Sequence, residues 1–362
     1  MRLNMHKLKN KFKRLFMSAA TIGTACLLAG CGAGAAAGTD NSSVTESQSG
    51  VNGSEQENAS SDSQKLQIVA TIFPEYDWVK EILGDQADNV DLTLLLGNGT
   101  DMHSFQPTME DILKVSTCDL FIYVGGESDS WVADALKGAG NPDRKAINLM
   151  DVLGDQVKEE ELVEGMQDED DHTHEEGHTH DDDLEYDEHV WLSLKNASLF
   201  CDTIASSLAD ADPEHSRLYQ QNAEAYEEKL AALDQEYQTS VEKSQSKTLL
   251  FADRFPFRYM VDDYGLNYYA AFAGCSAESE ASFETISFLA KKVDELQLPC
   301  ILTIEGEQHK IAETIKANTQ NQDQEILTMK SMQSVTSEDV QNGANYFSIM
   351  EENLNVLKQA LN

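Results

Sequence analysis

The strongest constraint on the fold is a pattern in which short apolar runs alternate with helical segments, and the pattern occurs twice. Apolar runs of four to eight residues have the usual length of buried strands. The expected strands cover 66–72, 90–96, 120–124 and 145–149 in the first set, and 248–252, 267–272, 300–304 and 325–329 in the second. The expected helices cover 75–83, 107–115, 130–136 and 197–208, then 257–263, 283–296, 308–317 and 344–361. Strands that alternate with helices pair in parallel and are covered on both faces. The chain is therefore predicted to form two α/β lobes, each with a mainly parallel sheet.

One long helix is predicted between the two lobes. Asp212 and Pro213 are typical of a helix start, as an N-cap followed by proline in the first turn. Apolar residues then follow at spacings of three and four, at Tyr219, Ala223, Tyr226, Leu230, Leu233, Tyr237 and Val241. A helix from 213 to 244 would be about 45–50 Å long, too long to lie beside one small sheet. We therefore expect an N-terminal lobe over 66–211, a linking helix over 212–245 and a C-terminal lobe over 246–362, with a cleft between the lobes.

The N-terminus has the features of an export signal. Six basic residues lie between Arg2 and Arg14, and an apolar stretch over 15–30 follows. The stretch is too short for a spanning helix, so residues 1–30 are predicted to be a signal peptide. It ends in Leu-Ala-Gly before Cys31, which resembles a bacterial lipobox and implies that Cys31 is lipidated. An ordinary signal peptide with an incidental cysteine is the alternative. Residues 31–65 contain almost no core-forming side chains and are expected to be a flexible tether. The folded part would then stand outside the cytoplasm, anchored to the cell membrane.

The net charge limits the partners that the chain could bind, and the cysteine content limits its disulfides. The formal charge is −38, and loss of the six basic residues of the signal would make it −44. Such acidity argues against nucleic acid or anionic lipid as a partner and suits attraction of cations, although solubility alone would also explain it. No CxxC pair is present. A Cys275–Cys300 disulfide is one possibility, and buried free thiols are the other.

Three of four candidate side chains follow predicted strands, at the edge where open α/β sheets bind ligands. His103 lies in the loop after the second strand, and His189 precedes the short apolar run 190–192. Asp253 and Glu305 follow strands of the second lobe. Two imidazoles and a carboxylate that converge from both lobes would suit a borderline cation such as Zn²⁺. Taken singly, each residue has an ordinary alternative as a surface or helix-terminal group.

Longer motifs give more specific evidence that these residues form a metal site. Residues 99–108, GTDMHSFQPT, resemble the first-ligand loop of the zinc and manganese solute-binding proteins of ABC transporters. Residues 187–197, DEHVWLSLKNA, closely resemble their second-ligand motif, and 71–77, 274–282 and 346–354 resemble further landmarks. The likeness spans 66–362. It implies two α/β lobes bridged by a long helix, metal bound between the lobes, a monomer, and delivery of the metal to a membrane permease.

The resemblance also implies ligands. It makes His103 the first, His189 the second and Glu305 an acidic one. The family usually has histidine at the position of Ala252, which cannot bind a metal, so Asp253, a water or a nearby residue would replace it. A second lobe with only carboxylate ligands would favour Mn²⁺ over Zn²⁺.

The segment 154–188 is strongly acidic and lacks apolar periodicity, and it is expected to be a long mobile loop. It contains His172, His174, His178 and His180 among carboxylates. Neutral imidazole binds Zn²⁺ well, so this loop is predicted to capture zinc, with incidental weak affinity as the alternative. His215 and His309 are expected to be surface residues, with His309 close enough in sequence to be a substitute ligand.

The predicted function is a lipid-anchored receptor that captures Zn²⁺ and delivers it to an ABC-transporter permease. Mn²⁺ as cargo in the same role is the first alternative. A metal-dependent surface hydrolase or an adhesin is an alternative of another class. The chain has no HExxH, no GxSxG and no nucleophile–base arrangement, so we expect no enzyme.

Overall fold

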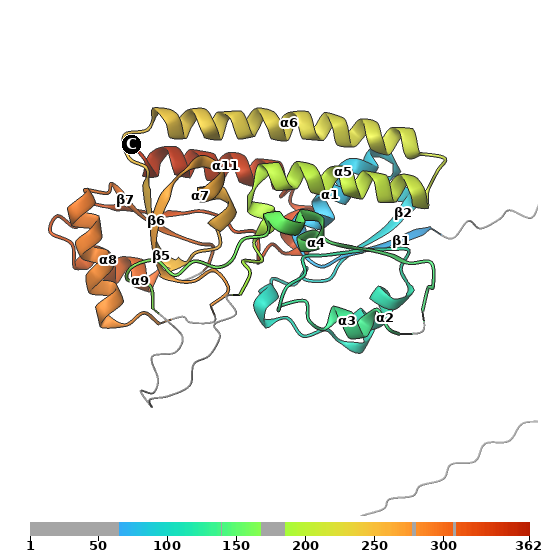
Figure 1. Ribbon diagram of the computed structural model, residues 1–362, viewed down its shortest axis with the longest axis horizontal. Coiled ribbons are helices and arrows are strands. Elements are labelled where there is room, and N and C mark those ends of the chain that lie inside the picture. Colours follow the sequence, from blue (N-terminus) through green and yellow to red (C-terminus); the bar gives the residue numbers. More distant parts are fainter. Residues whose placement is uncertain (1–64, 139, 168–184, 277–279, 307–308) are drawn as a thin grey trace, which may run out of the picture. The chain divides into compact units, whose positions relative to one another are not determined.

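The computed structural model describes residues 65–362 except 139, 168–184, 277–279 and 307–308 (Figure 1). These residues belong to one compact unit. It contains two four-stranded parallel sheets flanked by helices, as the alternating pattern predicts. The signal, the tether, Cys31 and the four histidines of the acidic loop lie outside the described residues.

The first sheet has the strand order β2-β1-β3-β4, and all its pairs are parallel. Its strands are β1 Leu66–Ala70, β2 Val90–Leu94, β3 Leu120–Tyr123 and β4 Lys145–Asn148. Its helices are α1 Phe73–Leu83, α2 Met109–Thr117, α3 Val132–Ala135, α4 Leu149–Leu153 and α5 Leu194–Ala211. The chain reverses its winding between β1 and β3, which makes the carboxyl ends of these two strands the expected place for a ligand.

The second sheet repeats the same order, as β6-β5-β7-β8. Its strands are β5 Thr248–Arg254, β6 Asn267–Phe272, β7 Cys300–Thr303 and β8 Glu325–Thr328. Its helices are α7 Arg258–Tyr264, α8 Phe283–Leu296, α9 Lys310–Ala317, α10 Ser337–Gln341 and α11 Tyr346–Ala360. The winding reverses between β5 and β7. Asp253, near the end of β5, accepts a hydrogen bond from Ile304 N just after β7, at 3.3 Å.

The linking helix is α6, Ser216–Lys243, which runs along both lobes (Figure 1). Its 28 residues correspond to about 42 Å. The predicted start at Pro213 is wrong, because the helix begins one turn later. The Asp212 carboxylate accepts from Tyr219 Oη and lies 2.7 Å from His215 Nδ1, and this holds 212–215 as a separate turn.

Hydrogen bonds join α6 to both lobes. Asn222 Nδ2 donates to Ile82 O in α1 at 2.8 Å, and Tyr237 Oη donates to Met350 O in α11 at 2.6 Å. The apolar stripe that predicted this helix is buried along its whole length. One hydrophobic core is continuous from β1 to the C-terminal helix, so the two lobes are packed together and not merely tethered.

The segment 154–188, which the sequence predicts to be a mobile loop, makes hydrogen bonds in its described parts. Glu159 pairs with Tyr186 in an antiparallel bridge. Lys158 N donates to Tyr259 Oη at 3.1 Å, and Gln167 N donates to Ala271 O at 2.9 Å. The two described ends of the segment are therefore bound to the second lobe, and the prediction of a single mobile loop over 154–188 is wrong for them.

Most other elements have the expected bounds within two or three residues. Two helices, α4 and α10, were not predicted, and each has only five residues. Helix α2 begins at Met109, because the Thr108 side chain caps it by accepting from Asp111 N. No helix among the described residues is both long enough and apolar enough to cross a membrane.

Candidate metal centre

Two imidazoles from the first lobe meet at the lobe interface. His103 lies in the short turn Met102–Ser104 after β2, where Asp101 Oδ1 accepts from His103 N at 3.0 Å. His189 is fully buried and comes directly before the turn Val190–Leu192. The two Nε2 atoms are 3.2 Å apart. The sequence predicted that these two residues share a site, and the structure brings them together.

The other ring nitrogens are held by oxygen atoms. His189 Nδ1 lies 3.1 Å from Asp187 Oδ1. His103 Nδ1 lies 2.9 Å from Ser128 Oγ and 3.5 Å from Glu188 Oε2. A carboxylate beside Nδ1 favours a proton on that nitrogen and leaves the Nε2 lone pair free, which is the usual arrangement of metal-binding histidine. Two lone pairs that face each other repel, and a cation between them would remove the repulsion. The residues therefore fit a metal ion.

A third donor comes from the second lobe. Among the described residues, donor atoms of His103, His189 and Cys275 all lie within 4.8 Å of one another. Cys275 follows the carboxyl end of β6, so the rule that selected the other candidates could have found it. From the sequence, Cys275 was predicted only to be a buried thiol or a disulfide partner. Cys275 and Cys300 are both free, so the disulfide possibility is wrong.

The loop that carries Cys275 packs tightly against His189. A Cβ atom added at Gly274 would lie 3.1 Å from His189 Cε1 and 2.9 Å from Phe255 O. Cys275 N donates to Glu160 Oε1 at 2.8 Å. The absence of a side chain at position 274 thus allows the close approach, and Glu160 holds the next residue in place.

The two carboxylates expected at the metal are engaged elsewhere. Glu305 accepts from Ser331 N at 2.6 Å, from Ser331 Oγ at 2.8 Å and from Gln333 N at 3.2 Å. Asp253 accepts from Arg254 N and Ile304 N. Neither joins the donor group found among the described residues. The 331–333 loop engages both Glu305 oxygens in this structure, and the role of Glu305 as a metal ligand stays a prediction.

A cavity of about 770 Å³ nevertheless connects these groups. Its lining includes His103, Asp253 and Glu305, together with Ala252 and His309. Ala252 offers no donor atom. His309 lines the cavity, and its Nδ1 atom is buried and has no hydrogen-bond partner among the described residues.

An ion pair crosses between the lobes beside the imidazoles. Arg254 Nη2 lies 2.6 Å from Asp101 Oδ2. Burial would raise the pKa of Asp101, but the Arg254 guanidinium outweighs burial and lowers it. Burial, reinforced by the charge of His189, lowers the pKa of His103. His103 is therefore neutral near pH 7 and has a lone pair available for a metal ion.

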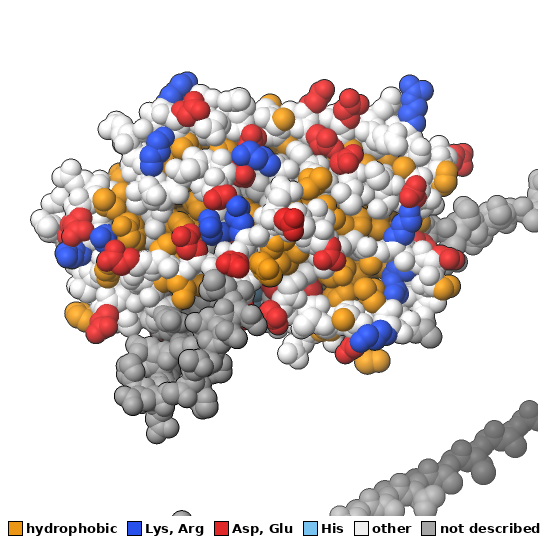
Figure 2. Space-filling model, in the orientation of Figure 1, with side chains coloured by type: hydrophobic (Ala, Val, Ile, Leu, Met, Phe, Trp, Pro, Cys, Tyr) orange, Lys and Arg blue, Asp and Glu red, His pale blue; other side chains and the backbone are white. Residues whose placement is uncertain are grey.

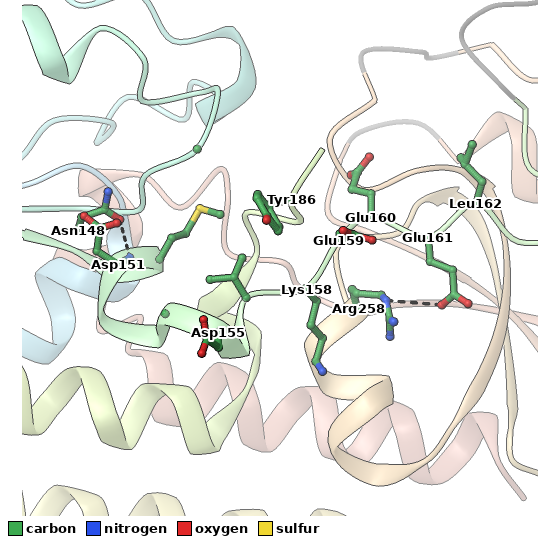
Figure 3. A pocket seen from close by; sticks show the side chains of 14 residues that line it. Asn148, Asp151, Asp155, Lys158, Glu159, Glu160, Glu161, Leu162, Tyr186 and Arg258 are labelled. Carbon is green, nitrogen blue, oxygen red and sulfur yellow. Dashed lines mark hydrogen bonds and ion pairs between the residues drawn. The ribbon is translucent and has the colours of Figure 1, made fainter. Parts of the chain in front are cut away.

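A larger cavity, of about 1130 Å³, has a different lining (Figure 3). Carboxylates dominate its polar lining, among them Asp151, Asp155 and Glu159, and Arg258 pairs with Glu161 at 3.5 Å. None of its lining residues is histidine or cysteine. Cavity size alone would therefore select the wrong place, and the donor chemistry identifies the smaller one.

Surface charge does not mark a site either. Acidic side chains are scattered over both lobes on the face shown in Figure 2 and do not form one continuous patch. Such a distribution attracts cations weakly and without selectivity. The acidic side chains on this face therefore do not indicate where a metal would bind.

Buried carboxyl groups lie behind the site in the first lobe. Burial, reinforced by the charge of Asp129, raises the pKa of Glu75 to about 8. Burial likewise raises the pKa of Asp129 to about 7. Glu75 Oε2 accepts from Thr71 N and Ile72 N at the start of α1, while Oε1 has no hydrogen-bond partner in the described part of the chain. The folded protein therefore holds protons that the unfolded chain would release.

We expect the Glu75→Gln variant to weaken the pH dependence of stability. Between pH 4.5, the ordinary pKa of the group, and about 8, the folded state binds more protons than the unfolded state, so the free energy of unfolding falls as pH rises. The amide cannot ionise, and at pH 8 we expect the variant to be more stable than the wild type by about 4 kcal/mol. Urea unfolding of the metal-free protein at pH 5 and pH 8 measures this. Glu81→Gln, an exposed site on α1, is the control. An unchanged pH dependence in the Glu75 variant would contradict the expectation.

The sequence profile of the ZnuA family, the periplasmic component A of a zinc-uptake complex, matches residues 68–360. The chain belongs to this family. It is a family of metal-uptake proteins and not of enzymes. The resemblance inferred from the motifs is confirmed.

Individual ZnuA relatives agree with this assignment. The zinc-binding lipoprotein AdcA of Streptococcus pneumoniae is 33% identical over 297 residues, which are 82% of this chain and 56% of that protein. The chain thus spans about half the length of this relative. The high-affinity zinc uptake system protein ZnuA of Bacillus subtilis is 29% identical, over 86% of this chain and 92% of that protein. The Zn(II)-bound ZnuA-like domain of S. pneumoniae AdcA has a TM-score of 0.64 at 28% identity, and the match covers 82% of this chain and 99% of that domain. The two-lobe α/β fold is confirmed by this likeness.

Proposed function

We propose that this protein is the extracytoplasmic receptor of a metal ABC transporter, which captures Zn²⁺ between its lobes and delivers it to the membrane permease. The observation that carries the proposal is the pair of imidazoles, with Nε2 atoms 3.2 Å apart and with Nδ1 atoms held by oxygens. Family membership supports the transport role. Zn²⁺ is the substrate of this role.

The donor set favours zinc over manganese. Imidazole nitrogens suit Zn²⁺, while Mn²⁺ lies low in the Irving–Williams order and prefers oxygen ligands. Two imidazoles without a carboxylate in the donor group therefore support Zn²⁺ as the cargo. The names of AdcA and ZnuA, which state zinc, support the same choice.

Glu305 and Asp253 belong to the proposal as oxygen donors that a bound ion would recruit. Both line the cavity that His103 also lines. Glu305 would have to exchange its hydrogen bonds with Ser331 and Gln333 for the metal. That exchange would link metal binding to the 331–333 loop of the second lobe.

The remaining parts of the proposal concern location and partners. Cys31 would carry the lipid anchor, and the segment 31–65 would let the folded part reach the permease. His172, His174, His178 and His180 would bind zinc weakly and raise its local concentration around the protein. The proposed receptor is a monomer, binds no nucleic acid and catalyses no reaction.

Competition between Zn²⁺ and Mn²⁺ tests the function. We expect the metal-free protein to bind one Zn²⁺ tightly at the imidazole pair and to release little of it to a large excess of Mn²⁺. Isothermal titration calorimetry, followed by mass spectrometry of the metal retained after dialysis, measures this. Additional zinc bound weakly by the acidic loop would appear as a separate, low-affinity phase. No tight binding, or preferential retention of Mn²⁺, would refute the zinc receptor.

A further inference from the structure

We propose that Cys275 is the third protein ligand of the metal, so that the site holds Zn²⁺ by two imidazole nitrogens and one thiolate sulfur. This inference rests on the proposed function and deepens it. The direct observation is that donor atoms of Cys275, His103 and His189 lie within 4.8 Å of one another. No other residue of the second lobe joins that group among the described residues.

The location of Cys275 gives the second lobe a donor. His103 and His189 both come from the first lobe, so without a further ligand an ion would be held from one side. The position of Ala252 offers no donor, and the Glu305 oxygens accept from Ser331 and Gln333. Sulfur from the loop after β6 completes a three-ligand site that spans the interface, which leaves a fourth position for water or for a recruited oxygen.

The loop is held where this role needs it. Glu160 Oε1 fixes the Cys275 backbone at 2.8 Å, and Gly274 lies against the His189 ring with no room for a side chain. Glu160 also lines the neighbouring acidic cavity, where Figure 3 shows it beside Glu159. A thiol on a loop fixed at two points has a definite distance to the imidazoles, as a metal ligand requires.

The exposure of Cys275 also differs from that of the other cysteines. Cys118, Cys201 and Cys300 are buried, whereas Cys275 is partly exposed. An ion held between the two imidazoles would be within reach of its sulfur, because the three donor atoms lie within 4.8 Å of one another. On binding, the S–H bond breaks, a sulfur–zinc bond forms, and the proton leaves to the solvent, so no oxidant or reductant is needed.

A thiolate ligand also explains selectivity. Sulfur donors suit Zn²⁺ and disfavour Mn²⁺ more strongly than a carboxylate in the same place would. Alanine at position 252, in place of the family's usual histidine, would then not shift the metal preference toward Mn²⁺. Cys275 would replace the missing imidazole with a softer donor.

Cobalt spectroscopy of the full chain tests the inference. Co²⁺ takes the place of Zn²⁺, and a thiolate bound to Co²⁺ gives a charge-transfer band in the near ultraviolet that nitrogen and oxygen ligands do not give. We expect the band in the wild type and in Cys300→Ser, a free and buried cysteine outside the donor group, and its loss in Cys275→Ser. We also expect Cys275→Ser to bind Zn²⁺ at least about 100-fold more weakly.

A second measurement needs no variant. The rate at which iodoacetamide alkylates Cys275 in the wild type, followed by peptide mass spectrometry, should fall when Zn²⁺ is bound. Stoichiometric Co²⁺ binding without the band, a band that persists in Cys275→Ser, or alkylation that Zn²⁺ does not slow would overturn the sulfur ligand and leave the zinc receptor standing. Failure of both metals to bind would refute the receptor as well.

Discussion

The double variant His103→Ala/His189→Ala is expected to lose measurable high-affinity zinc binding and to remain folded. The two rings supply both nitrogens of the donor group, and alanine supplies none. Each single variant should lower the affinity by at least about 100-fold. The backbone around His189 should persist, because Asp187 Oδ1 accepts from His189 N at 2.8 Å regardless of the side chain.

Thermal unfolding provides the clearest measurement of this loss. A ligand present at 1,000 times its dissociation constant stabilises the folded state by about 4 kcal/mol, which raises the melting temperature of the wild type. The double variant should show no such rise on addition of Zn²⁺. His215→Ala is the matched control, because His215 pairs with Asp212 before α6 and lies outside the donor group. A double variant that binds zinc as tightly as the wild type would place the site elsewhere.

The second large effect is expected at Trp191, which ties the histidine loop to the second lobe. Its indole Nε1 donates to Ser331 O at 2.8 Å, and its backbone carbonyl accepts from Tyr346 Oη at 2.6 Å. The side chain is fully buried, and its ring centroid lies 5.2 Å from that of His189. We expect Trp191→Ala to lower the free energy of unfolding by about 3–5 kcal/mol and also to weaken zinc binding, because the His189 ring loses its support.

Two further variants separate stability from binding. Trp78 is equally buried, but its ring packs against Phe200 and Tyr346. Neither of these contacts involves His103 or His189. Trp78→Ala should therefore cost similar stability and leave the zinc affinity of the folded protein unchanged. Trp191→Phe should keep most of the packing. Its free energy of unfolding should fall by about 1 kcal/mol, because the hydrogen bond to Ser331 is lost. Urea unfolding and calorimetry measure both quantities, and equal zinc affinities for the two alanine variants would contradict the role of Trp191.

Local signals were enough for elements with strong periodicity and clear ends. Helix 283–296 and strand 267–272 have the bounds that the sequence predicted. Ser282 caps the first by accepting from Thr285 N, which is a short-range interaction that the sequence reveals. Helix α6 was predicted one turn too long, because the choice between helix and turn at 212–215 depends on the side chains of His215 and Tyr219 around one carboxylate.

The sequence by itself determined the two-lobe α/β architecture, the linking helix and the pair His103 and His189. These depend on periodicity, on residue types and on motifs that are continuous along the chain. Only the tertiary structure decided which second-lobe group faces the imidazoles. Asp253 lies near the end of β5, and Cys275 and Glu305 follow β6 and β7, so all three satisfy the strand-end rule. Their distances to His189 depend on how the loops after β5, β6 and β7 pack, where backbone N–H groups at 331 and 333 engage Glu305 and the bare backbone of Gly274 brings the thiol close.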